Sequence, residues 1–361
     1  MQNTVYALGI DIHKESSTFV LVDHESTIYW QRRLKSTPKE YAAALAMLKT
    51  VVPLEGLPAA IEPVCGWKWA VTLLKEHGVD IEVANPRKVR LIAESLDKTD
   101  KNDATHLAWI RLVGKLPCSY VAPDDISEIR RLVRGYAYLI RLRTGIKNRL
   151  QALATEDGLN ISLGNVSTTT GLKLLMAERG EDTTYKASID ALNDLEANVA
   201  PLYRAMATLM REHSIIARLA TIPGVGVVTA TSVFAEIGDF SRFRSAKELA
   251  SFAGLVPRQR SSGEHVRYGG ITKKGPNLLR HMLVEAAMHI KATDEHALGL
   301  YFARMKQDHP DMAPKKLRIA LARRILTTMH GMVVHETNFD PGRYDRNRNQ
   351  VTSNYSLVAA K

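Results

Sequence analysis

Short apolar runs separated by polar turns dominate the first third of the chain. Runs at Val5–Asp11, Ser17–Val22 and Thr27–Leu34 predict three strands joined by tight turns, the pattern of an antiparallel meander. Two further runs predict strands at Pro58–Glu62 and Asp80–Ala84, and these alternate with segments of helical spacing at Pro38–Leu48, Trp67–His77 and Lys98–Leu112. Strands interleaved with helices in this order indicate an α/β domain with a mixed sheet over residues 1–122.

The rest of the chain has mainly helical periodicity. Asp124–Leu153 carries apolar residues at near-heptad spacing, and Leu172–His213 is again helical after a polar break at Asn160–Thr170. We therefore expect residues 123–214 to form a helical, coiled-coil connector. The pattern predicts a mainly helical domain over residues 215–336, with helices at Gly226–Ile237, Ser245–Phe252, Asn277–His289, Leu298–Asp308 and Ala313–His330. The polar segment 337–361 predicts a flexible tail.

Composition places the chain among globular proteins of more than one domain. Its 361 residues exceed what one core usually organises, and 45% of them are apolar. No run approaches about 18 consecutive apolar residues, and the N-terminus has no secretory pattern, so we expect neither a membrane span nor export. The two cysteines, Cys65 and Cys118, stand in unrelated contexts, which favours a reducing cytoplasm over a disulfide framework or a zinc site.

The positive charge of the chain is concentrated after the first domain. The formal net charge is +11; residues 1–122 hold 15 basic and 14 acidic side chains, whereas the remainder holds 34 and 24. A basic excess of this kind is typical of proteins with a polyanionic partner, most often nucleic acid. Charge that serves only solubility is the simpler alternative, and the motifs decide between the two.

Four acidic residues stand where an α/β fold gathers its functional groups. Asp11 and Glu62 each end an apolar strand, and the spacing of Asp100 and Asp103 places them on one face of a helix. Four converging carboxylates repel one another unless cations neutralise them, and hard oxygen ligands select Mg²⁺ or Mn²⁺. Two such ions about 4 Å apart can activate an attacking group and stabilise a leaving oxygen at a phosphodiester. Each acid alone is more simply explained as a turn, surface or helix-start residue.

A glycine-rich and basic region follows in the last third of the chain. The Gly-Val-Gly turn at 224–226 resembles a helix-hairpin-helix element that offers backbone N–H groups to phosphate, although such glycines also close ordinary turns. Beyond it, a loop with serines is flanked by Arg258, Arg260 and Arg267, which could hold a hydroxyl against a phosphate. From these residues alone a loop that only binds DNA is the simpler interpretation, because no local base is evident for the serine.

Together these segments resemble the DEDD-type transposases of insertion sequences, a group that includes the Piv-type pilin-gene DNA invertase. The resemblance covers about residues 5–335. The four acids match Gly-Ile-Asp at Asp11, Ile-Glu-Pro at Glu62, and Lys-Thr-Asp-Lys-Asn-Asp-Ala at Asp100 and Asp103. The family's C-terminal signature matches Ile-Pro-Gly-Val-Gly at 222–226, Phe-Ala-Gly-Leu-Val-Pro at 252–257 and the segment 273–280.

The resemblance implies a fold and a chemistry. It implies an RNase H-like N-terminal domain of the RuvC type, a topology that the order of predicted strands and helices also matches. Asp11, Glu62, Asp100 and Asp103 would be catalytic ligands of Mg²⁺, with Mn²⁺ as a possible substitute. A C-terminal transposase domain would supply a serine nucleophile, which falls on Ser262 by its position after Phe-Ala-Gly-Leu-Val-Pro, with Ser261 adjacent.

The resemblance also implies partners. Family members recombine DNA as dimers or tetramers, combine the acids of one protomer with the serine of another, and choose target and donor DNA with a structured non-coding RNA. The basic C-terminal part of this chain is suited to two such polyanions. The implied place of action is the bacterial cytoplasm, at the nucleoid. The residues that we expect to contact nucleic acid are Arg258, Arg260, Arg267, Lys273, Lys274 and Arg280.

Two positions depart from the family pattern. Where the family often has Glu-Ala-Thr-Gly, Glu62 is followed here by Pro-Val-Cys-Gly, which removes any hydroxyl role at that point. The Ser-Lys of the late signature is Thr272-Lys273, which retains a hydroxyl.

Three other functions stay open at this point. A RuvC-like junction-resolving nuclease would use the same acids to activate water and would leave no protein–DNA adduct. An actin-like or sugar-kinase ATPase also begins with Gly-Ile-Asp after a strand, but it needs glycine-rich nucleotide loops that the helical second half does not offer. A non-catalytic nucleic-acid-binding protein would tolerate the loss of all four acids.

Overall fold

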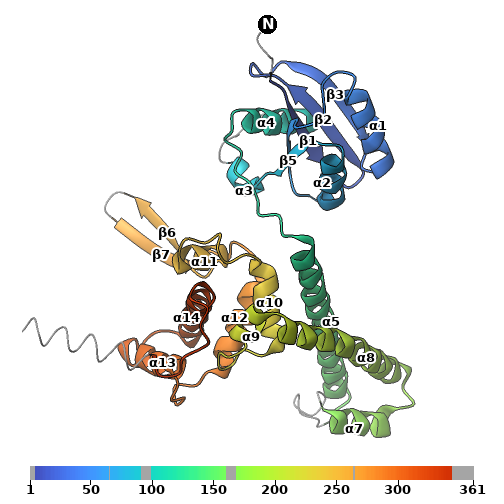
Figure 1. Cartoon of the computed structure of the whole chain (residues 1–361). Coiled ribbons are helices and arrows are strands. Elements are labelled where there is room, and N and C mark those ends of the chain that lie inside the picture. The colour runs from blue at the N-terminus through green and yellow to red at the C-terminus, as the bar shows by residue number, and fades with distance from the viewer. Residues whose placement is uncertain (1–4, 65, 91–98, 160–167, 263–264, 344–361) are drawn as a thin grey trace, which may run out of the picture. The chain divides into compact units, whose positions relative to one another are not determined.

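The chain forms two compact units that divide between Val121 and Ala122 (Figure 1). The computed structural model describes residues 5–64, 66–90, 99–159, 168–262 and 265–343. Residues 344–361, most of the segment expected to be a flexible tail, lie outside this range, as does Cys65.

The first unit is built on one five-stranded sheet with the strand order β3-β2-β1-β4-β5. The first three strands are antiparallel neighbours, whereas β4 runs parallel to β1 and β5 parallel to β4, so the predicted meander and the mixed sheet are both confirmed. The strands are β1 (Ala7–Ile12), β2 (Ser16–Val22), β3 (Ile28–Lys35), β4 (Pro58–Ile61) and β5 (Asp80–Val83).

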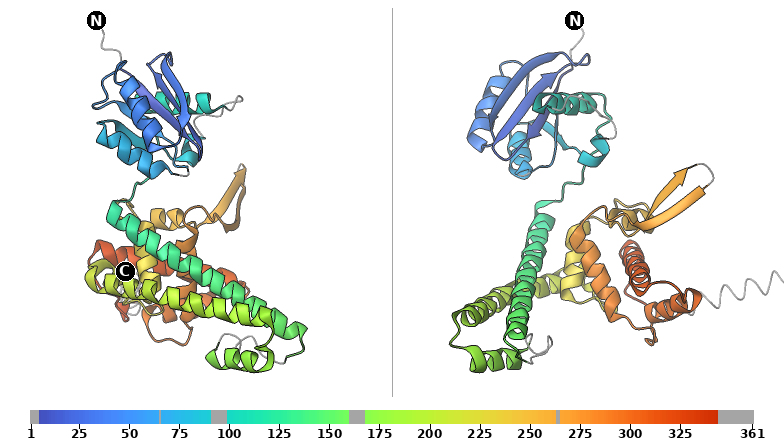
Figure 2. Two further views of the ribbon diagram at one scale, coloured as in Figure 1. Left: turned by 90° about the vertical axis from the view of Figure 1, so that its right-hand side faces the viewer. Right: turned by 180° about the vertical axis from the view of Figure 1, so that it is seen from behind.

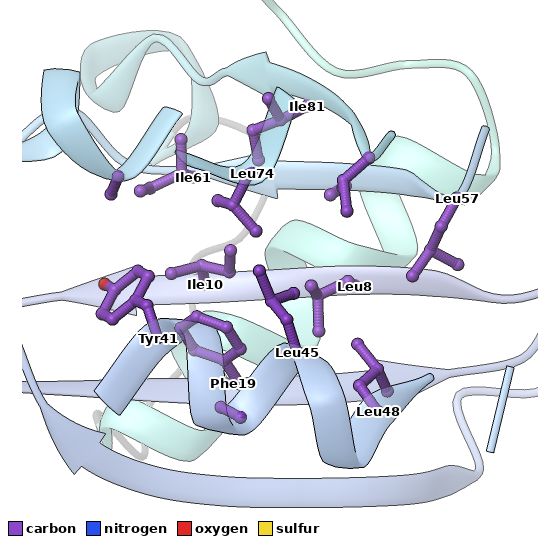
Figure 3. Close-up of a cluster of buried hydrophobic side chains, with 14 of the residues drawn as sticks. Leu8, Ile10, Phe19, Tyr41, Leu45, Leu48, Leu57, Ile61, Leu74 and Ile81 are labelled. Atoms are coloured by element: carbon purple, nitrogen blue, oxygen red, sulfur yellow. The ribbon is translucent and has the colours of Figure 1, made fainter. Parts of the chain in front are cut away.

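One face of this sheet carries the main core of the unit. Leu8 and Ile10 of β1 are fully buried there, beneath α1 (Pro38–Leu48) and α2 (Trp67–Glu76) (Figure 3). Helix α1 begins where the Thr37 side chain accepts a hydrogen bond from the Glu40 backbone, with a proline in the first turn. Such caps and the buried apolar stripe explain why helical spacing alone located both helices correctly.

The opposite face of the sheet is covered by α4 (Asp100–Leu112), which lies across β1, β2 and β4 (Figure 1). Residues that meet this helix are small: Ala7 on β1 packs with Ala104 and Ala108 on α4. A Cβ atom at Gly9 would lie only 1.8 Å from the Ala104 carbonyl oxygen, so only glycine allows this approach. The short helix α3 (Pro86–Val89) precedes α4 in the chain.

The second unit is mainly helical. Two long helices, α5 (Asp124–Glu156) and α8 (Thr183–Glu212), lie side by side and share an apolar cluster with α7 (Thr169–Arg179) (Figures 1 and 2). The other helices of the unit are α9 (Ser214–Leu219), α10 (Val227–Ile237), α11 (Ala246–Phe252), α12 (Asn277–His289), α13 (Ala297–Asp308) and α14 (Pro314–Val334).

The structure refines one sequence-based expectation in this unit and corrects another. The helical segment expected over Leu172–His213 consists of two helices, since α7 ends at Arg179 and Asp182 caps the start of α8 by accepting hydrogen bonds from the next turn. The basic loop after Pro257 is instead a hairpin of β6 (Pro257–Ser262) and β7 (His265–Ile271), which extends away from the helices of its unit (Figures 1 and 2). The sequence of β6 lacks the apolar alternation by which half-buried strands are found.

Candidate carboxylate site and basic hairpin

Asp11 lies on the central strand of the first unit, on the face covered by α4. It is 4% exposed, and its strand partner on β2 is Thr18. Because Ile10 pairs with Ile61 on the parallel neighbour β4, Asp11 and Glu62 are the next residues along adjacent strands. Residues at alternate positions of a strand share a face, so the α4 face of β1 consists of Ala7, Gly9 and Asp11.

The other two acids come from the first turn of α4. The Thr99 side chain accepts a hydrogen bond from the Asn102 backbone and so starts the helix directly before Asp100. Asp100 and Asp103 then project from successive positions of one helical face. The close packing of α4 at Gly9 brings this helix terminus to the end of β1. All four predicted acids therefore meet at one end of the sheet.

His13 lies among these acids, and sequence reasoning missed it. Its Nε2 atom is 3.2 Å from Asp11 Oδ2 and 3.4 Å from Asp100 Oδ1. The second oxygen of Asp100 lies 3.7 Å from Nη2 of Arg33, a residue of the edge strand β3. The signal for His13 was its place two residues after Asp11, because alternation directs both side chains to the same side of the strand end.

The buried carboxylate of Asp11 is electrostatically strained. Its pKa is raised to about 6, first by burial and then by the negative charges of Asp100, Asp103 and Glu62, while the nearby His13 acts in the opposite direction. Its Oδ2 atom is buried and accepts no hydrogen bond. His13 alone therefore does not offset the cost of this buried charge.

The donor set fits a divalent cation. One ligand atom each from Asp11, His13 and Asp100 lie within 4.8 Å of one another. For an ion about 2.1 Å from its ligands, adjacent corners of an octahedron are about 3.0 Å apart, close to the distances around His13 Nε2. Asp103 and Glu62 add acceptors whose charge reaches Asp11.

In the second unit, the two signature segments at 252–257 and 273–280 pack closely against each other at the base of the hairpin. Gly254 has φ of +69°, and a Cβ there would meet the Lys274 carbonyl oxygen at 2.2 Å; at Gly275 a Cβ would meet the Phe252 carbonyl oxygen at 1.8 Å. Arg280 Nη1 donates to the carbonyl groups of Ala253 and Gly275 at 3.2 and 2.9 Å. The guanidinium of Arg280, which we expected to contact nucleic acid, thus has an internal role in holding these segments.

The predicted nucleophile stands at the end of β6. Ser262 is the last residue of this strand and pairs in register with His265, while Arg260 pairs with Arg267. The Ser261–Val266 pair lies between these two pairs, so the three pairs form the end of the hairpin.

Comparisons with known proteins match segments of both units. Residues 8–156 match the DEDD transposase model, and residues 216–301 match the model described as the transposase IS116/IS110/IS902 family. The chain therefore carries both of the transposase domains that these models describe. It is 28% identical to the transposase of insertion sequence element IS1111A of Coxiella burnetii, over 81% of both chains. It is also 27% identical to the pilin gene-inverting protein of Moraxella bovis, over 75% of this chain and 77% of that one.

A third relative extends along nearly the whole chain. A probable family 20 transposase of Pseudomonas aeruginosa is 27% identical over 93% of this chain and 98% of its own length. The protein is thus a transposase of insertion-sequence type, an enzyme that recombines DNA. Membership of the DEDD class implies the use of a divalent metal ion.

The basic residues of α5 in this transposase are divided between internal and external roles. Arg134 forms a bidentate pair with Glu236 of α10, whose side chain is 1% exposed, and Arg130 Nε donates to the Ala235 carbonyl oxygen. Arg143 and Lys147 contact Glu196 on α8. These four residues therefore hold α5 against α10 and α8.

One cavity in the second unit joins basic and apolar side chains. It measures about 780 Å³ and lies between α5, the base of the hairpin and α12. Arg141, Lys273 and His281 contribute charge or hydrogen-bond donors to its wall, and Ile140 and Leu255 contribute apolar surface. Lys273 holds a positive φ of +53°, which is rare for a residue with a side chain.

Among the described helices, none is both long and apolar enough to span a membrane.

Proposed function

We propose that this transposase cuts and rejoins DNA at the ends of its insertion sequence through the carboxylate site of the first unit and Ser262 of the second. The observation that carries the proposal is the buried oxygen of Asp11, which accepts no hydrogen bond at a point where three other acids converge. The first unit would be an RNase H-like domain of the RuvC type, supported by its strand order. The second would be a helical connector over 123–214 and a transposase domain over 215–336.

The acids would hold Mg²⁺, or Mn²⁺ in its place. When bound, the ion supplies positive charge that polarises the scissile phosphate and stabilises the leaving oxygen. Asp11 would fix the position of the ion because it belongs to the central strand of the sheet. Asp100 and Asp103, in the capped first turn of α4, would provide further carboxylate ligands. Arg33, beside Asp100, is placed to bind a non-bridging oxygen of the phosphate.

Ser262 would then supply the nucleophile. Its oxygen attacks phosphorus, the bond from phosphorus to the sugar oxygen breaks, and the departing oxygen takes up a proton, which leaves a DNA–phosphoserine bond. Attack by the exchanged strand reverses the step, so the serine is released without net hydrolysis. We propose that His265, which pairs with Ser262 in the strand register, accepts the serine proton.

Charged residues of the second unit would bind the nucleic acids. We propose DNA contacts from Arg258, Arg260, Arg267, Lys273 and Lys274, and a structured guide RNA as a second polyanion. The acids and the serine belong to different compact units, and we propose that one protomer of a dimer or tetramer supplies the acids and another supplies the serine. The enzyme would act in the bacterial cytoplasm, at the nucleoid.

The deciding experiment asks for a covalent adduct. Purified protein with retained RNA, Mg²⁺ and labelled DNA carrying the joined element ends should give a denaturation-resistant protein–DNA complex. Ser262→Ala should lose the complex but still bind DNA, and Ser261→Ala is the matched control that should retain it. Cut DNA without any adduct would instead support the junction-resolving nuclease, in which the same acids activate water.

A mixing experiment separates the two arrangements of the site. Asp11→Asn and Ser262→Ala proteins should each be inactive alone. If acids and serine act from different protomers, a mixed dimer contains one site in which both residues are intact, and activity returns on mixing. Differential tags show whether mixed dimers have formed. If they have formed and activity does not return, both residues act within one protomer.

A further inference from the structure

We propose that His13 is a direct ligand of the divalent cation through Nε2, beside Asp11 and Asp100, and that this nitrogen shifts the preference of the site from Mg²⁺ towards Mn²⁺. The inference rests on the proposed metal site and concerns its composition. Four carboxylates predict an all-oxygen site, whereas the geometry at the end of β1 adds one imidazole.

The contacts of His13 favour coordination over a simple hydrogen bond. Two carboxylate oxygens, from Asp11 and Asp100, lie within 3.4 Å of one ring nitrogen. His13 Nε2 is hydrogen-bonded to Asp100 Oδ1, and because one ring nitrogen carries at most one proton, the buried Asp11 Oδ2 at 3.2 Å is left without a hydrogen bond. A shared cation would be coordinated by all three atoms, including the oxygen that the hydrogen bond leaves unsatisfied.

The backbone of His13 is held for this task. Its N–H donates to the Ser16 carbonyl oxygen at 2.9 Å, and its own carbonyl accepts from Ser36 Oγ at 2.7 Å. The chain of hydroxyls continues inward, with Ser36 Oγ 2.7 Å from Ser17 Oγ and Ser17 Oγ 2.6 Å from the Tyr41 hydroxyl. Ser36 donates its hydroxyl proton to the His13 carbonyl, so it must accept from Ser17, and Ser17 must accept from Tyr41. The series of hydrogen bonds therefore runs from the Tyr41 hydroxyl to the His13 carbonyl. The turn that carries the imidazole is thereby tied to the core.

The two oxygens of Asp100 have separate neighbours. Arg33 lies against Oδ2, whereas Oδ1 is hydrogen-bonded to His13 Nε2. Arg33 therefore orients the carboxylate from one side, and coordination of an ion by Oδ1 and Nε2 would replace the hydrogen bond between them.

Ligand chemistry gives the direction of the selectivity. Imidazole nitrogen suits transition metals, whereas Mg²⁺ strongly prefers oxygen ligands and keeps its waters. Mn²⁺ accepts both donor types at octahedral geometry. Replacing one water by an imidazole should therefore raise the affinity for Mn²⁺ more than that for Mg²⁺.

Pulsed electron paramagnetic resonance of Mn²⁺ bound to the full-length protein tests the assignment directly. We expect ¹⁴N modulation from a coordinated imidazole, converted to the ¹⁵N pattern when the protein contains ¹⁵N-histidine. His13→Gln should abolish the modulation and raise the Mn²⁺ dissociation constant about tenfold or more, with a smaller change for Mg²⁺. His24→Gln, which alters an exposed histidine of the same unit, should change neither.

Each other outcome overturns the assignment. Bound Mn²⁺ without nitrogen modulation, or modulation that survives in His13→Gln, would mean that His13 is not a ligand and pairs with the acids only as a charge. If wild type and Asp11→Asn both fail to bind Mn²⁺, the proposed carboxylate metal site fails with it. Tryptophan fluorescence checks that the variants are folded, since all four tryptophans of the chain lie in the first unit, at Trp30, Trp67, Trp69 and Trp109.

Discussion

Replacing Asp11 by asparagine should stabilise the metal-free enzyme while it abolishes cleavage. The pKa of Asp11 is about 6 against an ordinary value of 3.8, because burial and the neighbouring acids disfavour the carboxylate. This difference corresponds to a penalty of roughly 3 kcal/mol for the ionised form in the folded state. Asparagine removes the charge but must find its own hydrogen bonds, so we expect a gain of about 1–3 kcal/mol at pH 7.5.

The sign of the pH dependence follows from the raised pKa. Between about pH 4 and pH 6 the folded protein holds a proton on Asp11 that the unfolded chain has released. The free energy of unfolding of the wild type therefore falls as pH rises through this window and stays lower above it. The variant has no such group, so the two proteins should be nearly equal at pH 4 and should diverge towards pH 7.5.

Tryptophan fluorescence makes this a measurement on one unit, because every tryptophan lies before Val121. Urea titrations in EDTA should give a higher midpoint for Asp11→Asn at pH 7.5, and a saturating divalent cation should reverse the order by stabilising only the wild type. Glu76→Gln, an exposed acid at the end of α2, is the control and should change little. A difference that is the same at pH 4 and pH 7.5, or a variant that is less stable at pH 7.5 in EDTA, would refute the reasoning.

Three further changes probe the supports of the two units. Gly9→Ala should push α4 from the sheet, lower the stability of the first unit by about 1–3 kcal/mol and weaken Mn²⁺ binding; unchanged metal affinity would count against the close-approach argument. Arg134→Met leaves Glu236 buried without its partner and should destabilise the second unit by about 3–5 kcal/mol in thermal unfolding followed by circular dichroism, with partial recovery on adding Glu236→Gln. Tyr41→Phe removes the first donor of the hydroxyl chain and should cost about 1–2 kcal/mol in urea unfolding, whereas a neutral effect would show that water replaces it.

The carboxylate site was accessible from the sequence because it depends on local rules. Apolar runs that end in an acid located Asp11 and Glu62, and an i to i+3 spacing located the α4 pair. The contact that brings α4 to β1 could not be predicted from the sequence. It depends on the absence of a side chain at Gly9, whereas a glycine within a strand is usually interpreted as a sign of a bulge or a bend.

The hairpin was inaccessible for the opposite reason. Strands are recognised by the face that they bury, and β6 has mostly polar residues on both sides. Its existence depends instead on pairing with β7 and on the two segments that flank the hairpin and are held together by Arg280. The same holds for Glu236: a single acid in an apolar helix gives no indication that Arg134, about a hundred positions earlier, neutralises it.

The two halves of the proposed chemistry are supported in different ways, and this difference has a physical logic. Asp11 must keep an unfavourable charge in place before any ion or DNA arrives, so it stands on the central strand, where the core between the sheet, α1 and α2 can bear the cost. The proposed serine nucleophile must reach a phosphate within a large polyanion, and it stands at the end of a hairpin whose sequence is rich in arginine. A reaction on bulky DNA makes a different demand on each site. The acids need rigid support, and the proposed nucleophile needs a projecting, positively charged strand pair.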